Sequence, residues 1–226
     1  MKKDKSRTPL PARKRRALKY LTIAALTVVL VNYTLHTGLL LPIQAIRAVE
    51  EREGVPHGRV VTRLWEPAVH KTGLFYLTEN ETMVLLGNTY LSLLGWTPGF
   101  GWALDCASGA PLYAGETSSC RDGGETVWHF YGRVDSPEIE TVEISLRSIT
   151  GYDQERGENL YEEQVLLAAG REDWLEKEGR RFFLLRCQLE DWPEHSGVNA
   201  FAIGRDAAGN LVTEFPIEEG THSYYG

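Results

Sequence analysis

The chain has 226 residues, with 24 basic and 31 acidic side chains and a formal net charge of −7. Residues 1–19 hold nine basic side chains and one acidic, residues 20–41 hold none of either kind, and the remainder holds 15 basic against 30 acidic. The acidic body excludes nucleic acid as a partner, because phosphate backbones require a positive surface. A basic stub, an uncharged stretch and an acidic body together indicate a membrane topology.

Residues 20–42 are predicted to form one transmembrane helix, which makes the lipid bilayer the first expected partner. About 21 uncharged residues give a helix of about 31 Å, which matches a hydrocarbon core of about 30 Å. Basic residues at 13–16 and Lys19 favour a cytoplasmic tail at 1–19 and an extracytoplasmic body in the cell envelope. We expect an uncleaved signal anchor, since Ala45-Ile46-Arg47 is a poor cleavage site. A cleaved signal, or a twin-arginine signal at 15–16, is the alternative.

Two polar residues, Asn32 and His36, are spaced four apart within this segment. They favour either a contact with another membrane helix or a slightly polar anchor that makes no such contact. Beyond the segment, residues 43–56 are predicted to form a juxtamembrane helix, with Pro42 at its start and Pro56 past its end.

Residues 57–124 are predicted to form a small β-rich region, because the periodicity becomes strand-like. The strands expected here are Arg59–Trp65, Gly73–Leu77, Met83–Leu86 and Thr89–Leu94. A loop is expected over Gly95–Trp102, which is rich in glycine, and another over residues 106–125, with one short strand at most.

Residues 125–226 are predicted to form a second β unit. Its expected strands are Thr126–Val134, Ile139–Leu146, Gln164–Ala168, Arg181–Leu189, Val198–Ile203 and Leu211–Phe215. A loop or one helical turn is expected over residues 171–178. The segment from Asp206 to Asn210 predicts a hairpin turn, in which Asp206 bonds the backbone and Gly209 or Asn210 has positive φ.

Two segments of this unit resemble bacterial immunoglobulin-like domains. "NAFAIGRDAAGNLVTEF" is similar to their last two strands and "GRVDSPEIETVEISL" to their opening strands, so the likeness spans roughly Glu125–Ile217. The resemblance implies an Ig-like β-sandwich that serves as a spacer or binding module. "HKTGLFYL" and "LLGNTYLSLLGW" resemble short β-rich ectodomains of single-pass membrane proteins from Gram-positive bacteria, a likeness that implies no activity.

Three cysteines lie beyond the membrane segment. Cys106 and Cys120 are separated by 13 residues, and an exported location permits a disulfide between them. Cys187 lies in an apolar strand and is expected to be a buried small hydrophobe.

Asp105-Cys106-Ala107-Ser108-Gly109 is similar to the Asp-Cys-Ser-Gly motif of bacterial cell-wall cysteine peptidases. That likeness implies a thiol nucleophile at Cys106 with His129 as its base. Ala107 interrupts the motif, and Pro111 argues against the helix that follows the nucleophile in that family.

Three aromatic residues, Trp96, Phe100 and Trp102, are close together in the sequence. They favour either a satellite core or a surface that stacks on sugar rings of an envelope glycan. The polar group Glu190, Asp191, Glu194 and His195 favours a solvated loop over a metal or proton-sharing site. No histidine spacing predicts a metal, and no cofactor motif is present.

The sequence therefore predicts a mainly β ectodomain behind one transmembrane helix. Its expected function is a non-enzymatic, membrane-tethered binding module with a glycan or protein partner. The alternatives are an envelope hydrolase that uses Cys106, and an accessory subunit of a membrane complex.

Overall fold

The computed structural model describes residues 11–35, 39–68, 71–92, 95–120, 126–154, 158–188 and 198–217. The fold is mainly β, as predicted, with three antiparallel four-stranded sheets. Sheet A has the order β1-β2-β3-β4, sheet B the order β5-β6-β10-β9, and sheet C the order β12-β11-β7-β8.

The helices are α1 (Ala12–Leu35), α2 (Pro42–Arg52) and the 3-10 turn η1 (Arg171–Asp173). Sheet A is built from β1 (Arg59–Ala68), β2 (Lys71–Glu79), β3 (Met83–Ser92) and β4 (Gly95–Asp105). Sheet B is built from β5 (Leu112–Cys120), β6 (Thr126–Val134), β9 (Leu175–Lys177) and β10 (Arg180–Gln188). Sheet C is built from β7 (Thr141–Asp153), β8 (Glu158–Ala169), β11 (Val198–Arg205) and β12 (Leu211–Ile217).

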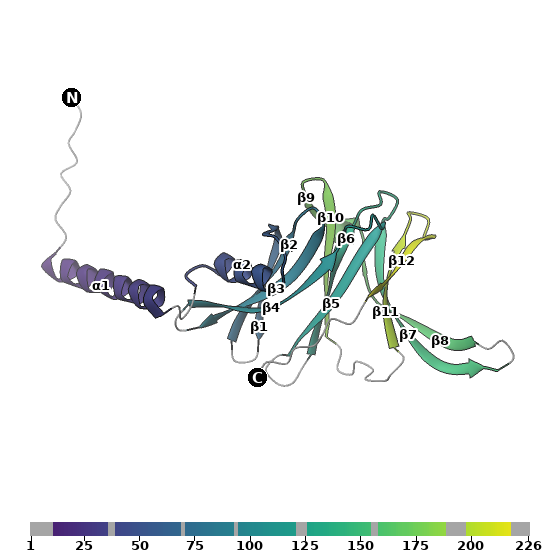
Figure 1. Cartoon of the computed structure of the whole chain (residues 1–226), viewed down its shortest axis with the longest axis horizontal. Coiled ribbons are helices and arrows are strands. Elements are labelled where there is room, and N and C mark those ends of the chain that lie inside the picture. Colours follow the sequence, from purple (N-terminus) through teal and green to yellow (C-terminus); the bar gives the residue numbers. More distant parts are fainter. Residues whose placement is uncertain are drawn as a thin grey trace, which may run out of the picture.

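The elements stack as four layers, α2, sheet A, sheet B and sheet C (Figure 1). Sheet B lies in the middle, so every residue from Val127 to Val134 of β6 is buried. Phe130 faces the core shared with sheet C, whereas its neighbour Tyr131 faces the core shared with sheet A. The predicted boundary at 124/125 falls between β5 and β6, which are paired neighbours in sheet B.

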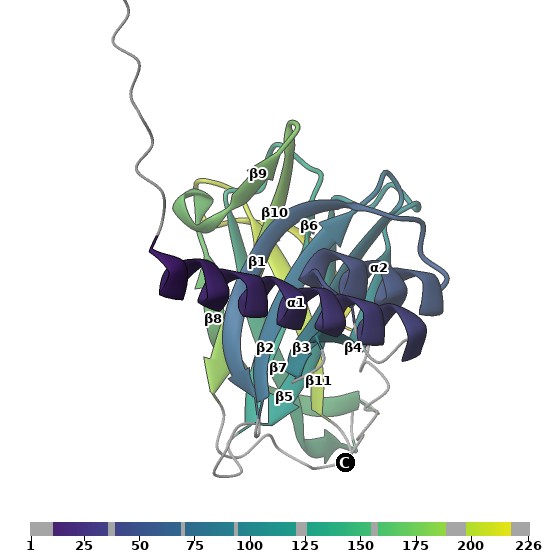
Figure 2. The same cartoon turned by 90° about the vertical axis from the view of Figure 1, so that its left-hand side faces the viewer.

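Helix α2 lies against sheet A (Figure 2). It is part of the core, because Ala45, Ile46 and Val49 are fully buried there. Two paired glycines, Gly87 and Gly101, lie under it. A Cβ on Gly87 would lie 2.5 Å from Ile46 Cδ1, and one on Gly101 2.4 Å from Val49 Cγ1. These glycines therefore let the helix approach the sheet closely.

The loop predicted over Gly95–Trp102 is wrong, because these residues belong to β4. The break predicted at residues 87–88 is also wrong, because β3 is continuous there. In both strands glycine is required because a larger residue would collide with α2. From the sequence alone, such a glycine is not distinguishable from a glycine in a turn.

The loop predicted over residues 106–125 is wrong for Leu112–Cys120, which form β5. The small residues of this strand hide its periodicity, and it is buried on both faces from Leu112 to Thr117. A Cβ on Gly115, for example, would lie 3.0 Å from the ring of Tyr131.

The turn between β11 and β12 confirms the predicted hairpin. Asp206 Oδ1 accepts hydrogen bonds from the amides of Ala208 and Asn210, and Gly209 has φ of +84°. The bonds from Asn210 hold the pKa of Asp206 below its usual value.

The predicted transmembrane segment is helical up to Leu35, and residues 36–38 lie outside the described part. Leu39, which was expected to be helical, instead forms a β-bridge with Trp96, through backbone bonds of 2.7 and 2.8 Å. Within the described ranges, none of the helices combines the length and the apolar character needed to cross a bilayer.

Candidate functional sites

The three aromatic residues singled out in the sequence all lie on β4, but they do not form one surface. Trp96 is 9% exposed and packs under α2, whereas Phe100 and Trp102 pack into the core between sheets A and B. Phe100 lies 4.4 Å from Trp102 and 5.9 Å from Phe75, measured between ring centroids. This arrangement is the satellite-core alternative, and it does not present three aromatic faces to a glycan.

A β-bulge explains why Trp96 and Phe100, which are four residues apart on β4, face opposite sides of sheet A. The register between β3 and β4 shifts between Gly87 and Thr89. At this point the buried Asn88 accepts a hydrogen bond from the Phe100 amide at 2.8 Å and donates one to the Tyr90 hydroxyl at 2.5 Å. The extra residue turns Phe100 toward sheet B although Trp96 faces α2.

Cys106 is a free thiol that is 3% exposed, at the end of β4. Burial raises its pKa to about 12, and the positive charge of Arg133 opposes that shift only in part. A thiol nucleophile requires a lowered pKa and solvent access, so this environment does not activate Cys106.

His129 is fully buried in the middle of β6, where its ring stacks on Phe75 at 4.7 Å. Cys106 is placed instead beside Arg133, which donates a hydrogen bond to the Cys106 carbonyl at 2.9 Å. Four strand residues, or about 13 Å, separate Arg133 from His129. The structure therefore does not bring the expected nucleophile and base together.

The disulfide between Cys106 and Cys120 is not formed in this structure. Tyr113 is the strand partner of Arg133, so Cys106 lies near the start of β5. Cys120 ends the same strand, about 23 Å from Tyr113, whereas a disulfide needs Cα atoms within about 7 Å. Cys187, the third cysteine, is a half-buried free thiol beside the core between sheets B and C, and burial raises its pKa.

Other predicted residues lie outside the described part of the chain. These are the polar group at residues 189–197, His36 and the side chain of Asn32. Among the described residues, no group of three potential ligands is placed to hold a metal ion.

A protruding hairpin is the first feature that the sequence pattern did not predict. β7 and β8 form a hairpin that extends beyond the rest of sheet C (Figure 1). The neighbouring strand β11 pairs with β7 only as far as Ser148. Large apolar side chains are exposed along this hairpin. They are Ile149 (44%), Tyr152 (60%), Leu160 (51%), Tyr161 (55%) and Val165 (51%).

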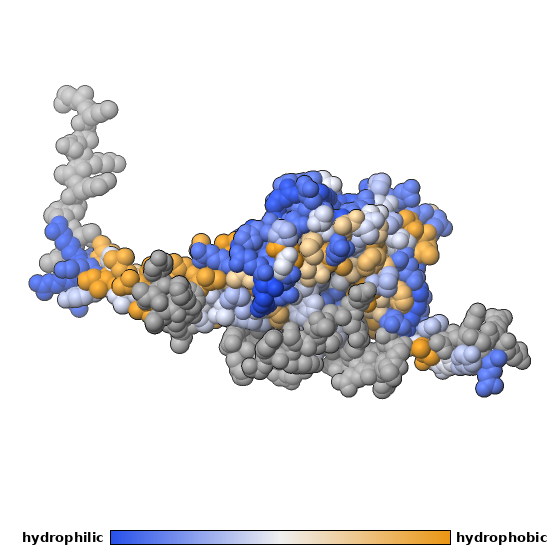
Figure 3. All heavy atoms as spheres, viewed as in Figure 1, coloured by the Kyte–Doolittle hydropathy of each residue, from blue (hydrophilic) through white to orange (hydrophobic). Residues whose placement is uncertain are grey.

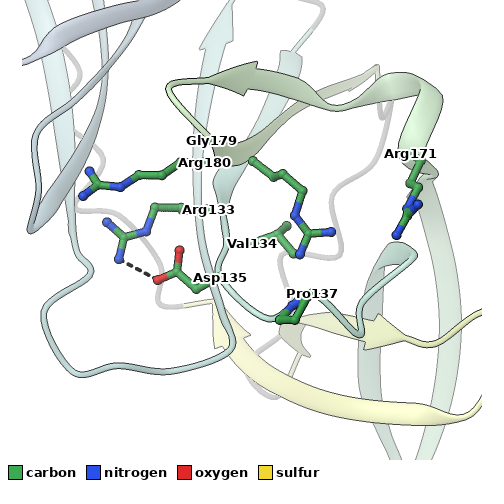
Figure 4. A pocket seen from close by; sticks show the side chains of 8 residues that line it. Arg133, Val134, Asp135, Pro137, Arg171, Gly179 and Arg180 are labelled. Carbon is green, nitrogen blue, oxygen red and sulfur yellow. Dashed lines mark hydrogen bonds and ion pairs between the residues drawn. The ribbon is translucent and has the colours of Figure 1, made fainter.

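The second unpredicted feature is a pocket of about 440 Å³ at the end of sheet B, where β6 ends and β10 begins. Four of its eight lining residues are arginines, namely Arg133, Arg171, Arg180 and Arg181, and one is acidic, Asp135 (Figure 4). We call it the arginine pocket. The adjacent Arg180-Arg181 pair in an acidic body was the only signal for it in the sequence.

Comparisons with models of protein families, with curated proteins and with solved structures find no match to this chain. Its function is therefore argued from its own geometry.

Proposed function

We propose that the chain is a membrane-tethered, extracytoplasmic interaction module without catalytic activity. α1 would anchor it in the bilayer, the four-layer body would lie outside, and the β7–β8 hairpin would bind an extended segment of a partner protein. We also propose that the paired sheets of the C-terminal half are Ig-like, on the strength of the Asp206 turn.

The anchor is supported by α1, which extends away from the sheets and whose surface is mainly apolar after the basic residues that end at Lys19 (Figures 1 and 3). Its exposed apolar side chains point in all directions around the helix. They include Leu21 (68%), Ile23 (48%), Leu26 (63%), Val28 (54%) and Leu30 (62%). An apolar surface on all sides is typical of a helix whose surroundings are apolar. The hydroxyls of Thr22 and Thr27 bond to carbonyls one turn earlier, at 2.9 Å each, so neither hydroxyl requires water.

The observation that carries the interaction proposal is the edge of sheet C. Among the strands that the structure describes, β8 is the last of that sheet, and none of them pairs with its outer edge, which can therefore accept an added strand. Ile149 and Tyr161 are cross-strand partners, and their exposed side chains lie together on one face of the hairpin.

Charge on the hairpin favours a basic partner over a second copy of the chain. Glu162 and Glu163 are exposed on β8, and Glu163 also pairs with Arg147 of β7 at 3.6 Å. Antiparallel pairing of two β8 strands centred on these residues would place like charges opposite one another, which is destabilising. An extended segment that alternates Lys or Arg with apolar residues would instead match both the acidic and the apolar side chains.

The hydrolase alternative has no comparable support, given the buried thiol of Cys106 and its separation from His129. The accessory-subunit alternative concerns the membrane face at Asn32 and His36, and it is compatible with the hairpin proposal.

A photo-crosslinking amino acid at Leu160, in the full-length chain in its own cells, tests the hairpin. Leu211 on β12 is the matched control, since it is 59% exposed on another edge of the same sheet. We expect a discrete adduct from position 160 that is lost when Glu162 and Glu163 are changed to lysine, and none from position 211. Equal adducts at both positions, or none at either, would refute the hairpin as the binding site.

A further inference from the structure

The arginine pocket lies between the β9–β10 hairpin, the segment after β6 and η1 (Figure 4). Successive side chains of a strand point to opposite sides of the sheet, so the arginines on β6 and β10 lie on both sides of sheet B. Arg133 and Arg180 lie on the side of sheet A, where Arg180 pairs with the buried Glu79 at 2.9 Å. Arg181 lies on the other side, where it donates to the carbonyl of Ile139 at 3.2 Å.

Three of the four arginines have a carboxylate partner. Arg133 pairs with Asp135 at 2.7 Å, Arg180 with Glu79, and Arg171 with Glu140. No ion pair connects Arg181 with any of the residues that the structure describes. Its guanidinium is held by the carbonyls of Ser136 and Ile139 and lies over the ring of Trp174, 4.4 Å from the centroid.

The charges around Arg181 include a second cation. Burial lowers the pKa of Arg181, the charge of Arg171 lowers it further, and together they outweigh the opposing effects of Glu140, Glu176 and Asp135. A negative group between Arg171 and Arg181 would remove this repulsion, and Arg171 is exposed enough to move toward it, at 62%.

Two buried donors at the pocket have no acceptor in the described structure. The first is the Nε–H of Arg133, which lines the pocket, and the second is the indole N–H of Trp174, which does not line it but whose ring lies under the Arg181 guanidinium. Buried polar atoms in proteins nearly always have a hydrogen-bond partner, so each unpaired donor requires an explanation. The indole N–H of Trp174 lies on the side of sheet B that holds Arg181, whereas the Nε–H of Arg133 lies on the opposite side, so one ligand does not serve both.

We propose that the arginine pocket binds a phosphate group, through Arg181 and Arg171. Guanidinium groups present planar pairs of donors that match phosphate oxygens, and two such groups, at Arg171 and Arg181, match the charge of a phosphate dianion better than that of a carboxylate. This inference goes beyond the proposed function and depends on neither the membrane anchor nor the β7–β8 hairpin.

Calorimetric titration of the full-length chain in detergent with inorganic phosphate, at constant ionic strength and with chloride as the reference anion, tests the proposal. We expect saturable binding, with a dissociation constant that rises about tenfold in Arg171→Gln and in Arg181→Lys. Arg171→Gln changes an exposed side chain, and Arg181→Lys retains the positive charge, so neither change removes the fold.

Arg205→Gln is the matched control, because Arg205 is 32% exposed and pairs with Glu143 on sheet C, outside the pocket. Its affinity for phosphate should equal that of the unmodified chain. A parallel titration with glycerol 3-phosphate distinguishes the source of the group, since tighter binding than inorganic phosphate indicates a phosphomonoester ligand. No saturable binding of either ligand, or binding that both pocket variants leave unchanged, would overturn the proposal.

Discussion

The side chain of Asn88 accepts a hydrogen bond from the backbone amide of Phe100, 2.8 Å away, and so fixes the bulge between β3 and β4. Asn88 is fully buried, and Gly99 leaves room for it, because a Cβ there would lie 1.9 Å from Asn88 Oδ1. The bulge directs Trp96 to α2 and Phe100 to sheet B. One polar side chain thus determines which core each aromatic residue joins.

Replacing Asn88 with alanine should therefore destabilise the body. The Phe100 amide and the Tyr90 hydroxyl would each lose the partner that Asn88 supplies, at a cost of about 1–3 kcal/mol in the free energy of unfolding. Urea denaturation followed by tryptophan fluorescence measures this change. An unfolding free energy equal to that of the unmodified chain would show that Asn88 does not hold the bulge.

Gly87→Ala should destabilise the contact between α2 and sheet A by about 1–3 kcal/mol, because the new Cβ overlaps Ile46 Cδ1. Valine lacks that atom, so Ile46→Val should cost less in the Gly87→Ala background than in the unmodified chain. A double-mutant cycle by thermal or urea unfolding measures the coupling. Gly151→Ala is the control, since its Cβ meets only Leu160 Cδ1 at 3.6 Å. If the losses in unfolding free energy from Gly87→Ala and Ile46→Val are simply additive, the contact between position 87 and Ile46 is contradicted.

Cys106 should resist alkylation at pH 8 in the folded chain and react rapidly in urea, because burial raises its pKa to about 12. Mass spectrometry after iodoacetamide treatment measures both rates. Rapid reaction of the folded chain would revive the hydrolase hypothesis.

The same pKa gives a pH dependence of stability. The unfolded thiol ionises near pH 9 and the folded thiol near 12, so the folded state binds more protons between these values and stability falls as pH rises through this window. The slope from Cys106 is at most about 1.4 kcal/mol per pH unit. Cys106→Ala should flatten the loss of stability between pH 9 and 10, and an unchanged slope would place the titration elsewhere.

Glu79→Gln should loosen the junction between sheets A and B. The Glu79 carboxylate is fully buried between Arg59 at 3.0 Å, an ion pair without hydrogen-bond geometry, and Arg180 at 2.9 Å. Removing its charge leaves two arginines without their shared partner, and we expect a loss of about 1–3 kcal/mol by urea denaturation. Glu163→Gln, at a half-exposed ion pair of 3.6 Å with Arg147, retains an oxygen that accepts the hydrogen bond from Ser145, and it should cost less than about 1 kcal/mol. Equal losses would contradict a special role for Glu79.

Strand-rich character and several strand positions could be predicted because alternation is visible wherever one face of a strand is exposed, as in Thr141–Leu146 of β7. The hairpin at Asp206 could be predicted because turn chemistry is local. β4 and β5 could not, since their glycines and small residues serve contacts with α2 and Tyr131 that exist only in the assembled fold. The arginine pocket combines β6, η1 and β10, which are distant in sequence, and the pairing of β6 with β10 brings Val134 opposite Arg181.

A membrane anchor at α1 requires the two ends of the chain to lie on opposite sides of the membrane, which labelling can measure. One variant carries a cysteine at exposed Glu172 in the body, and a second carries one at Ser6 in the N-terminal tail. Intact cells are treated with a membrane-impermeant maleimide. Labelling of the unmodified chain gives the background from its own thiols. We expect labelling of Glu172→Cys in intact cells and of Ser6→Cys only after permeabilisation, with the chain retained in the membrane fraction at alkaline pH. Labelling of Glu172→Cys only after permeabilisation, or release of the chain from the membrane fraction, would contradict it.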